Sequence, residues 1–427
     1  MSAAAGAMSR FWQAWLAAII FVFPVPHTVA LRNLLLLAGL IALLWGCRKS
    51  LPKLPSWLKH ATWWLIALTA WIAFHSVVVA PAPMLALEQF RANWVMPLLF
   101  GVLATWATTQ LPRERATQAL VFALTAHLLW LLVWQFVLWF ESGAWPFKST
   151  PFGAYDYHGT LISFLLAPLV ADRLAWILQR HSPLTLGSWP GWALLLLSLV
   201  ADVALQSRNS TVISLAILLA AGLLLLAVRA RDPRALVAII FIALVGAGSL
   251  SFDSRWQGLR ESAAVGWSST SSYWMTGDVA TRPSTPSGAV LEESAYARSA
   301  WASQAVTLIA DHPLGIGFGH DAFGRAVATK HGHAGMGSSH SGWLDFALGT
   351  GLVGLALLLA TAGSAMRSGW KEFRERNNAS ALLLMFFVGG YTLRCLFDGH
   401  LSGWRLGMFA FIVGVLIGAM HERRSAP

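Results

Sequence analysis

Long uninterrupted apolar runs constrain this chain more than any other feature of its sequence. A helix of about 20 apolar residues is needed to cross the roughly 30 Å hydrocarbon core of a bilayer. Because lipid offers backbone amides no hydrogen-bond partner, each such run must form a helix. The sequence therefore predicts an all-α integral membrane protein with about twelve transmembrane helices, over residues 11–29, 33–47, 61–80, 92–109, 118–140, 158–178, 189–206, 211–228, 235–252, 341–363, 379–397 and 403–420.

The composition also excludes a soluble protein. Of the 427 residues, 56% are hydrophobic and 11% are charged, and the mean hydropathy is +0.60, whereas soluble globular chains have about 25% charged residues. The two cysteines, Cys47 and Cys395, fall near opposite membrane faces, so no disulfide is expected. The first apolar run lacks a small-residue cleavage site, so we expect it to remain as an anchor.

The positions of lysine and arginine predict which way the chain crosses the membrane, because short cytoplasmic loops hold an excess of both. With the N-terminus inside, the inner segments contain 18 of the 30 basic residues, including Arg173 near the end of the sixth run. Both termini are then cytoplasmic. This orientation divides the chain into nine helices (1–252), a long outer loop (253–340) and three further helices with a cytoplasmic tail (341–427).

The net charge of +11 does not indicate a nucleic-acid partner. Most of the basic residues lie in the inner clusters, where they set the topology and attract anionic lipid headgroups. Membrane lipids are therefore expected partners, and nucleic acid is not.

The outer loop has three parts of different composition. Residues 262–287 are rich in serine, threonine, glycine and proline and are predicted to be flexible. Residues 291–310 are predicted to form an amphipathic surface helix, with Ala297, Trp301, Val306 and Leu308 near one side. A glycine-rich turn, DHPLGIGFGHDAFGR, follows it, and KHGHAGMGSSH leads back to the membrane.

Four histidines lie in or beside the end of this loop: His320, His331, His333 and His340. Imidazoles bind zinc, and Asp321 could add an oxygen ligand. Their spacing matches no zinc-binding helix motif, however, and the surrounding glycines would hold the ligands poorly. We therefore expect no metal and no cofactor, and we interpret His331 and His333 as ordinary loop histidines.

A polar string, Gln206 to Thr211, interrupts the apolar sequence between the seventh and eighth runs. It places Arg208 among hydrogen-bonding side chains, including Gln206 and Asn209, near bilayer depth, where a charge is costly without a partner or water. A guanidinium ringed by donors suits a diphosphate group. The alternative is that Arg208 only marks a helix end.

The string HSGWLDFALGTGLVG, from His340 to Gly354, sets a titratable imidazole at the water end of an apolar helix. Histidine is the side chain whose ordinary pKa suits proton transfer near neutral pH. The pattern His-Ser, nine residues, then Gly-x-x-Gly resembles the signature of the O-antigen ligase and polymerase superfamily. Gly351 and Gly354 are expected to allow close helix packing.

The resemblance implies roles for particular residues. It implies that His340 is the general base and that Arg208, in its Ser-Arg motif, binds the lipid diphosphate. Arg298, in YARSAWASQAV ahead of a His-Pro-x-Gly-x-Gly turn, is expected to do the same. A solvated ion pair with Glu292 or Glu293 is the alternative for Arg298. The wider set of expected substrate-binding residues comprises Arg208, Arg298, Asn209, Gln206, Ser341 and Arg91, and mutual pairing is expected for Arg394, Asp398 and Arg405.

The resemblance further implies a GT-C-like glycosyltransferase in a Gram-negative inner membrane with a periplasmic active site. The expected reaction is inverting, metal-independent transfer of O-antigen from undecaprenyl diphosphate to the lipid A–core oligosaccharide. An O-antigen polymerase or a protein O-oligosaccharyltransferase of the same superfamily is the alternative, because these enzymes share the histidine motif. A lipid-linked oligosaccharide flippase has a similar helix count, but it would carry charges through several helices rather than at the outer face.

Overall fold

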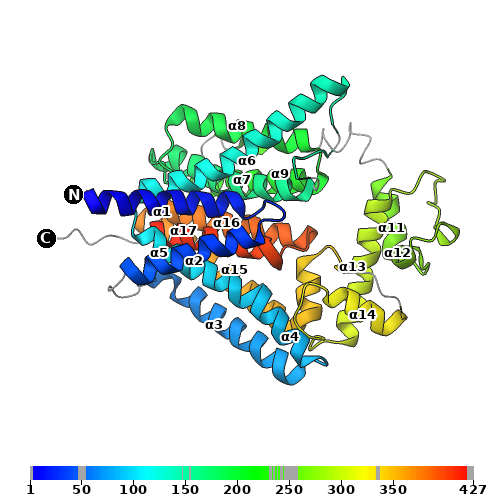
Figure 1. Ribbon diagram of the computed structural model, residues 1–427. Helices are drawn as coiled ribbons and strands as arrows, with labels where there is room; N and C mark the ends of the chain where they lie inside the picture. The colour runs from blue at the N-terminus through cyan, green and yellow to red at the C-terminus, as the bar shows by residue number, and fades with distance from the viewer. Residues whose placement is uncertain are drawn as a thin grey trace.

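The computed structural model describes residues 3–46, 54–146, 148–152, 155–229, 258–332 and 337–420, with a few isolated positions between 233 and 244. These residues form helices joined by turns, with no strand among them (Figure 1). The protein is therefore all-α over the part that the structure describes.

The first half of the chain forms a series of long helices. Two of its connections are single π-helical turns, at His75–Val79 and Arg91–Val95, and Ser56–Leu58 is a 3-10 turn. The helices are α1 (Ala3–Val22), α2 (Val29–Gly46), α3 (Lys59–Phe74), α4 (Pro83–Phe90), α5 (Met96–Thr109), α6 (Arg113–Ser142), α7 (Tyr155–Gln179), α8 (Ser188–Leu205) and α9 (Arg208–Val228).

The second half contains short helices followed by three long ones. The short ones are α11 (Leu259–Trp267), α12 (Tyr273–Thr276), a 3-10 turn (Val279–Thr281), α13 (Glu293–Asp311) and α14 (Ala322–His331). The long ones are α15 (Gly342–Arg376), α16 (Ala379–Phe397) and α17 (Gly403–Ala419).

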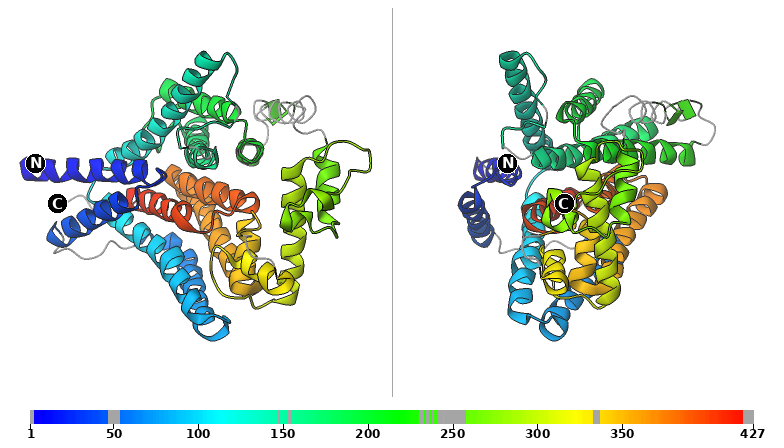
Figure 2. Two further views of the ribbon diagram at one scale, coloured as in Figure 1. Left: turned by 45° about the vertical axis from the view of Figure 1, so that its right-hand side comes forward. Right: turned by 90° about the vertical axis from the view of Figure 1, so that its right-hand side faces the viewer.

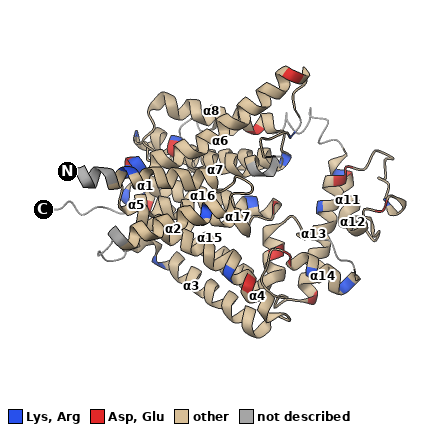
Figure 3. Cartoon of the chain, viewed as in Figure 1, with Lys and Arg blue, Asp and Glu red and all other residues tan. Residues whose placement is uncertain are grey.

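Seven helical segments among the described residues are long and apolar enough to cross a membrane, and three shorter apolar helices accompany them. Eleven of the twelve predicted runs overlap helical segments. The predicted ninth run, 235–252, lies outside the described residues apart from isolated positions. Charged residues are sparse along the helical bundle (Figure 3). The structure thus supports a polytopic membrane protein, and the predicted count of twelve spans is not confirmed by the described residues.

The centre of the bundle is formed by α7 and α16, together with α5 and α17. Most of α7 is buried inside the protein, so it is a central helix. Helices α5 and α17 lie in close contact because small residues face one another: a Cβ atom at Gly414 would stand 2.2 Å from the Gly101 carbonyl oxygen.

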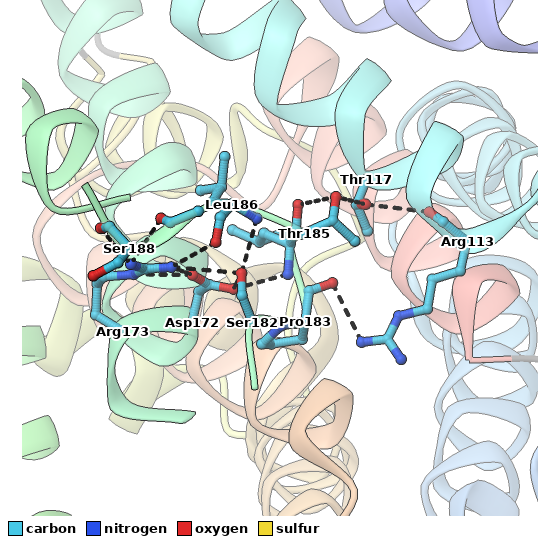
Figure 4. A network of polar contacts seen from close by, with 11 residues as sticks. Arg113, Thr117, Asp172, Arg173, Ser182, Pro183, Thr185, Leu186 and Ser188 are labelled. Atoms are coloured by element: carbon cyan, nitrogen blue, oxygen red, sulfur yellow. Dashed lines mark hydrogen bonds and ion pairs between the residues drawn. The ribbon is translucent and has the colours of Figure 1, made fainter. Parts of the chain in front are cut away.

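A buried polar network holds the connection between α7 and α8 (Figure 4). Asp172 and Arg173 form a buried ion pair. The Asp172 carboxylate accepts hydrogen bonds from the Ser182 hydroxyl and the Leu184 N–H, both at 2.8 Å, and Arg173 donates to the Ser188 carbonyl oxygen at 3.0 Å. Arg173 is therefore a buried structural residue of α7.

Helices α11 to α14 form a separate layer at one end of the bundle, and the start of α1 and the end of α17 lie at the opposite end (Figures 1 and 2). This layer has its own apolar core, which includes Trp274, Tyr296, Leu308, Phe323 and Val327. The start of α15 packs against it. The layer thus covers the end of the bundle where α15 begins.

Three predictions for this layer need correction. Residues 262–287 were expected to be flexible, but they contain the end of α11 and all of α12, because Trp274 packs into the core and its carbonyl accepts a hydrogen bond from Trp301. On α13, Val306 is 47% exposed, whereas Ala305 and Leu308 are buried. Helix α14 replaces part of the segment predicted to be a return loop.

Candidate functional site

A cavity of about 410 Å³ lies where α15 begins and α16 ends, beneath the α11–α14 layer. This volume is within the range of small-ligand sites. The walls come from α13, the turn before α14, the first turns of α15 and the connection between α16 and α17. The wall residues that bear polar or titratable groups include Arg298, His320, Ser338, His340, Asp345, Asp398, His400, Ser402 and Arg405.

His340 stands at the entrance to α15. The helix begins at Gly342, with Ser341 at its N-cap position. The Gly342 N–H donates to the Asp398 carbonyl oxygen at 3.1 Å, which ties the helix start to the end of α16. The His340 ring stacks on Trp301 of α13, with ring centroids 5.0 Å apart. The stack on Trp301 therefore orients the imidazole. His340 lines the cavity and remains partly exposed to solvent.

The backbone of His340 is in the left-handed region, with φ of +59°. A non-glycine residue in this conformation costs on the order of 1–3 kcal/mol and persists only where its surroundings hold it. Such a conformation in the residue that carries the imidazole indicates that the local structure fixes its direction.

The electrostatic surroundings favour the neutral form of this imidazole. Desolvation of the ring, followed by the positive charge of Arg298, lowers the pKa of His340, while the negative charge of Asp398 opposes the shift. The unprotonated ring is thus the main form at neutral pH. It is able to accept a proton from a ligand in the cavity.

Arg298 lies on α13 and reaches the end of α16. Its guanidinium donates to the Phe397 carbonyl oxygen at 3.3 Å and lies 3.8 Å from the Asp398 carboxylate. The alternative of an ion pair with Glu292 or Glu293 is not what the structure shows, because these carboxylates pair with Arg208 and Arg282 instead.

Asp398 joins three elements at the floor of the cavity. Its carboxylate accepts a hydrogen bond from Asn209 of α9 at 3.1 Å and pairs with Arg298 and, at 3.2 Å, with Arg394. Arg394 is buried and also donates to the Gly159 carbonyl oxygen at 2.9 Å. The predicted pairing of Arg394 with Asp398 is confirmed.

Arg405 occupies a different part of the cavity wall, with its guanidinium over the Trp404 ring at 5.2 Å. His400 is a buried part of the wall and contacts Thr160 at 2.6 Å through its Nε2 atom. Burial, followed by the charge of Arg394, lowers the pKa of His400 far below its usual range, so this ring is neutral.

Arg208 is the first residue of α9 and pairs with Glu292 at 2.5 Å. Glu292 is also the N-cap of α13, where its carboxylate accepts from the Ala295 N–H. Arg208 therefore links α9 to the helix that carries Arg298. Gln206, two residues before Arg208, adopts a left-handed conformation at the end of α8, with φ of +56°.

Several predicted site residues lie beside the cavity rather than on it. Among the described residues, the wall does not include Arg208, Gln206, Asn209, Ser341 or Arg91. Ser341 is buried and its carbonyl oxygen accepts the Asp345 N–H at 2.9 Å. Arg91 is exposed at the start of the π-turn Arg91–Val95. The structure thus brings His340 and Arg298 together and places Asn209 one hydrogen bond away.

The comparison with known families agrees with this location. Residues 193–359 match the family model Wzy_C, described as O-antigen ligase. This segment of the chain is therefore similar to the O-antigen ligase family. The superfamily suggested by the histidine string is thereby confirmed, and the matched residues include Arg208, Arg298 and His340. No curated protein matches the chain.

Two acidic groups at this cavity were not expected at the site. Asp345 lies inside an apolar helical run. Its position five residues after His340 was the sequence feature that could have indicated a place at the site. Asp398 was predicted only as a charge partner. No group of three or more potential metal ligands occurs among the described residues, and His333 lies outside them.

Proposed function

We propose that this protein is an O-antigen ligase that transfers O-antigen from undecaprenyl diphosphate to the lipid A–core oligosaccharide. The observation that carries the proposal is the neutral imidazole of His340 beside Arg298 on the wall of one cavity, within the segment that matches the ligase family. This is a base next to a cation, at the end of a membrane bundle.

The proposed reaction is a single inverting displacement. The acceptor hydroxyl oxygen attacks the anomeric carbon of the donor as the bond from that carbon to the phosphate oxygen breaks. His340 takes the hydroxyl proton, and the bonding electron pair leaves with the diphosphate. Arg298 and Arg208 stabilise the negative charge that builds on the leaving oxygen, a role for which preorganised charges are well suited and which requires no metal ion.

Both arginines have acidic partners in the structure, Glu292 for Arg208 and Asp398 for Arg298. In the proposal these carboxylates orient the guanidinium groups until the diphosphate takes their place. The Arg298 pair is long, at 3.8 Å, which leaves room for a competing phosphate oxygen. Arg208 reaches the same diphosphate by exchanging Glu292 for it.

The proposal places the cavity at the periplasmic face of the inner membrane and both termini in the cytoplasm. It is supported by the arrangement of the chain, since the start of α1 and the end of α17 lie at the end of the bundle away from the α11–α14 layer. A flippase is disfavoured by the gathering of the cavity's charged groups at one end of the helices.

The test uses purified protein in lipid vesicles with a preformed lipid-linked glycan and rough lipopolysaccharide, analysed on a gel. The proposal expects one ligated product that requires the lipopolysaccharide acceptor. A ladder of longer lipid-linked glycans without acceptor would show a polymerase instead, and transfer to a protein acceptor alone would show a protein oligosaccharyltransferase.

A further inference from the structure

A buried carboxylate lies directly behind the residue proposed as the base. Asp345 is in the first turns of α15 and is 7% exposed, although it also forms part of the cavity wall. An acidic group at a helix N-terminus is favoured by the helix dipole. The helix dipole explains why an acidic residue lies near the start of α15. It does not explain the hydrogen bonds that the Asp345 carboxylate accepts.

Both carboxylate oxygens of Asp345 bind the turn that precedes His340. One accepts the Ser338 hydroxyl at 2.7 Å, and the other accepts the Ser339 N–H at 2.9 Å. The Ser338 oxygen in turn accepts the His340 N–H at 2.9 Å. These three hydrogen bonds tie the carboxylate to the turn, and two of them reach the backbone of His340 by way of Ser338.

This network acts on a residue whose conformation needs support. His340 is in the left-handed region at φ of +59°, and its ring must keep both its stack on Trp301 and its place at the cavity. Asp345 reaches the backbone of His340 through Ser338, whose hydroxyl donates to the carboxylate and accepts the His340 N–H. Loss of the carboxylate would release that backbone from the helix on which the site is built.

We propose that Asp345, through Ser338, is the positioning residue that holds His340 in its left-handed conformation and aims the imidazole at the acceptor hydroxyl. This inference rests on the proposed role of His340 as the base. Asp345 does not touch the reacting atoms in this account. It acts on the rate by fixing the direction of another side chain.

The experiment compares Asp345→Asn and Ser338→Ala with the unaltered protein. The amide introduced by Asp345→Asn keeps one acceptor oxygen and loses the other, so the turn loosens without a change of shape. Asp311→Asn is the control, because Asp311 is an exposed acid of α13 that pairs with Lys330 away from the cavity. Each variant is measured for kcat and donor KM, and for the rate at which diethyl pyrocarbonate modifies His340, followed by mass spectrometry.

Misplacement of a catalytic group by about 1 Å can cost about 100-fold in rate. We therefore expect kcat to fall about 10- to 100-fold for Asp345→Asn and for Ser338→Ala, with the donor KM changed less than about 2-fold. The modification rate of His340 should change in both variants and stay constant in Asp311→Asn. A purely structural role would lower the thermal stability and leave kcat and the modification rate of the folded protein unaltered, which would overturn the proposal.

A second pair of variants separates this inference from the proposed function. In a chain that already has His340→Ala, Asp345→Asn should reduce the residual transfer rate no further, because its effect passes through His340. An undiminished additional loss would overturn the positioning role. Normal transfer by His340→Ala alone would instead overturn the base assignment on which the inference rests.

Discussion

At the scale of single residues, the charges around His340 decide when its ring can accept a proton. Desolvation and Arg298 lower its pKa from the usual 6.5, and Asp398 opposes them. A base whose pKa is lowered is mainly unprotonated at pH values above that lowered pKa. The reaction then loses rate only when the pH falls through it.

We predict that the acidic limb of the kcat–pH profile has its midpoint below pH 6.5, the ordinary value for histidine. Arg298→Gln removes a nearby positive charge, so it should shift this limb to higher pH in addition to weakening donor binding. Arg208→Gln is the matched control, because its charge is not among the causes of the His340 shift. It should weaken donor binding without moving the limb, and an equal shift in both variants would contradict the assignment.

Some features of the site could be predicted from the sequence, and others could not. The start of α15 directly after His340 followed from the change between a polar loop and an apolar run, and the structure places it at Gly342. The partner of Arg298 did not follow, because Asp398 lies 100 positions later and only the packing of α13 on α16 brings them together. The burial of Arg173 did not follow either, because its partner Ser188 meets it only through the packing of the α7–α8 connection.

At the scale of elements, packing decides details that periodicity alone does not. The apolar side of α13 was predicted only in part, because its face is rich in small alanines and depends on where Trp274 docks. The long apolar runs were predicted reliably as helices, since a membrane segment has no alternative. Close contacts such as that between α5 and α17 depend on glycines that face one another, and only the structure shows which glycines do so.

Gly414→Ala tests this close packing. The new Cβ would stand 2.2 Å from the Gly101 carbonyl oxygen, so the two helices must separate. Overpacking of this kind costs about 1–3 kcal/mol, and thermal unfolding in detergent should show a lower midpoint. Gly363→Ala is the control, because nothing lies within 4 Å of its added Cβ in α15. An unchanged midpoint for Gly414→Ala, or an equal fall in both variants, would refute the packing argument.

At the scale of the whole molecule, the proposed reaction depends on which side of the membrane the cavity faces. The α11–α14 layer and the cavity lie at one end of the bundle, and the start of α1 and the end of α17 lie at the other. The proposed reaction requires the cavity end to be periplasmic. The bundle shape was predictable from the apolar runs, but the cavity beneath the layer was not, because it is formed by four segments distant in sequence.

Cysteine accessibility tests this orientation in a chain whose native Cys47 and Cys395 are replaced. Thr270→Cys, on an exposed part of the outer layer, should react with a membrane-impermeant maleimide in cells whose outer membrane is permeabilised. Glu375→Cys, exposed at the far end of α15, should react only after the inner membrane is broken. The reverse pattern would place the cavity in the cytoplasm and exclude the proposed reaction.

The most direct measurement of the central claim is donor binding and transfer by His340→Asn. Asparagine tolerates the left-handed conformation, so the helix entrance should keep its shape while the base is lost. We expect normal binding of labelled lipid-linked glycan and a loss of about 10² to 10⁴ in transfer rate, the usual contribution of general base catalysis. Arg208→Gln and Arg298→Gln should lower binding as well as transfer. Near-normal transfer by His340→Asn at normal expression would contradict the account.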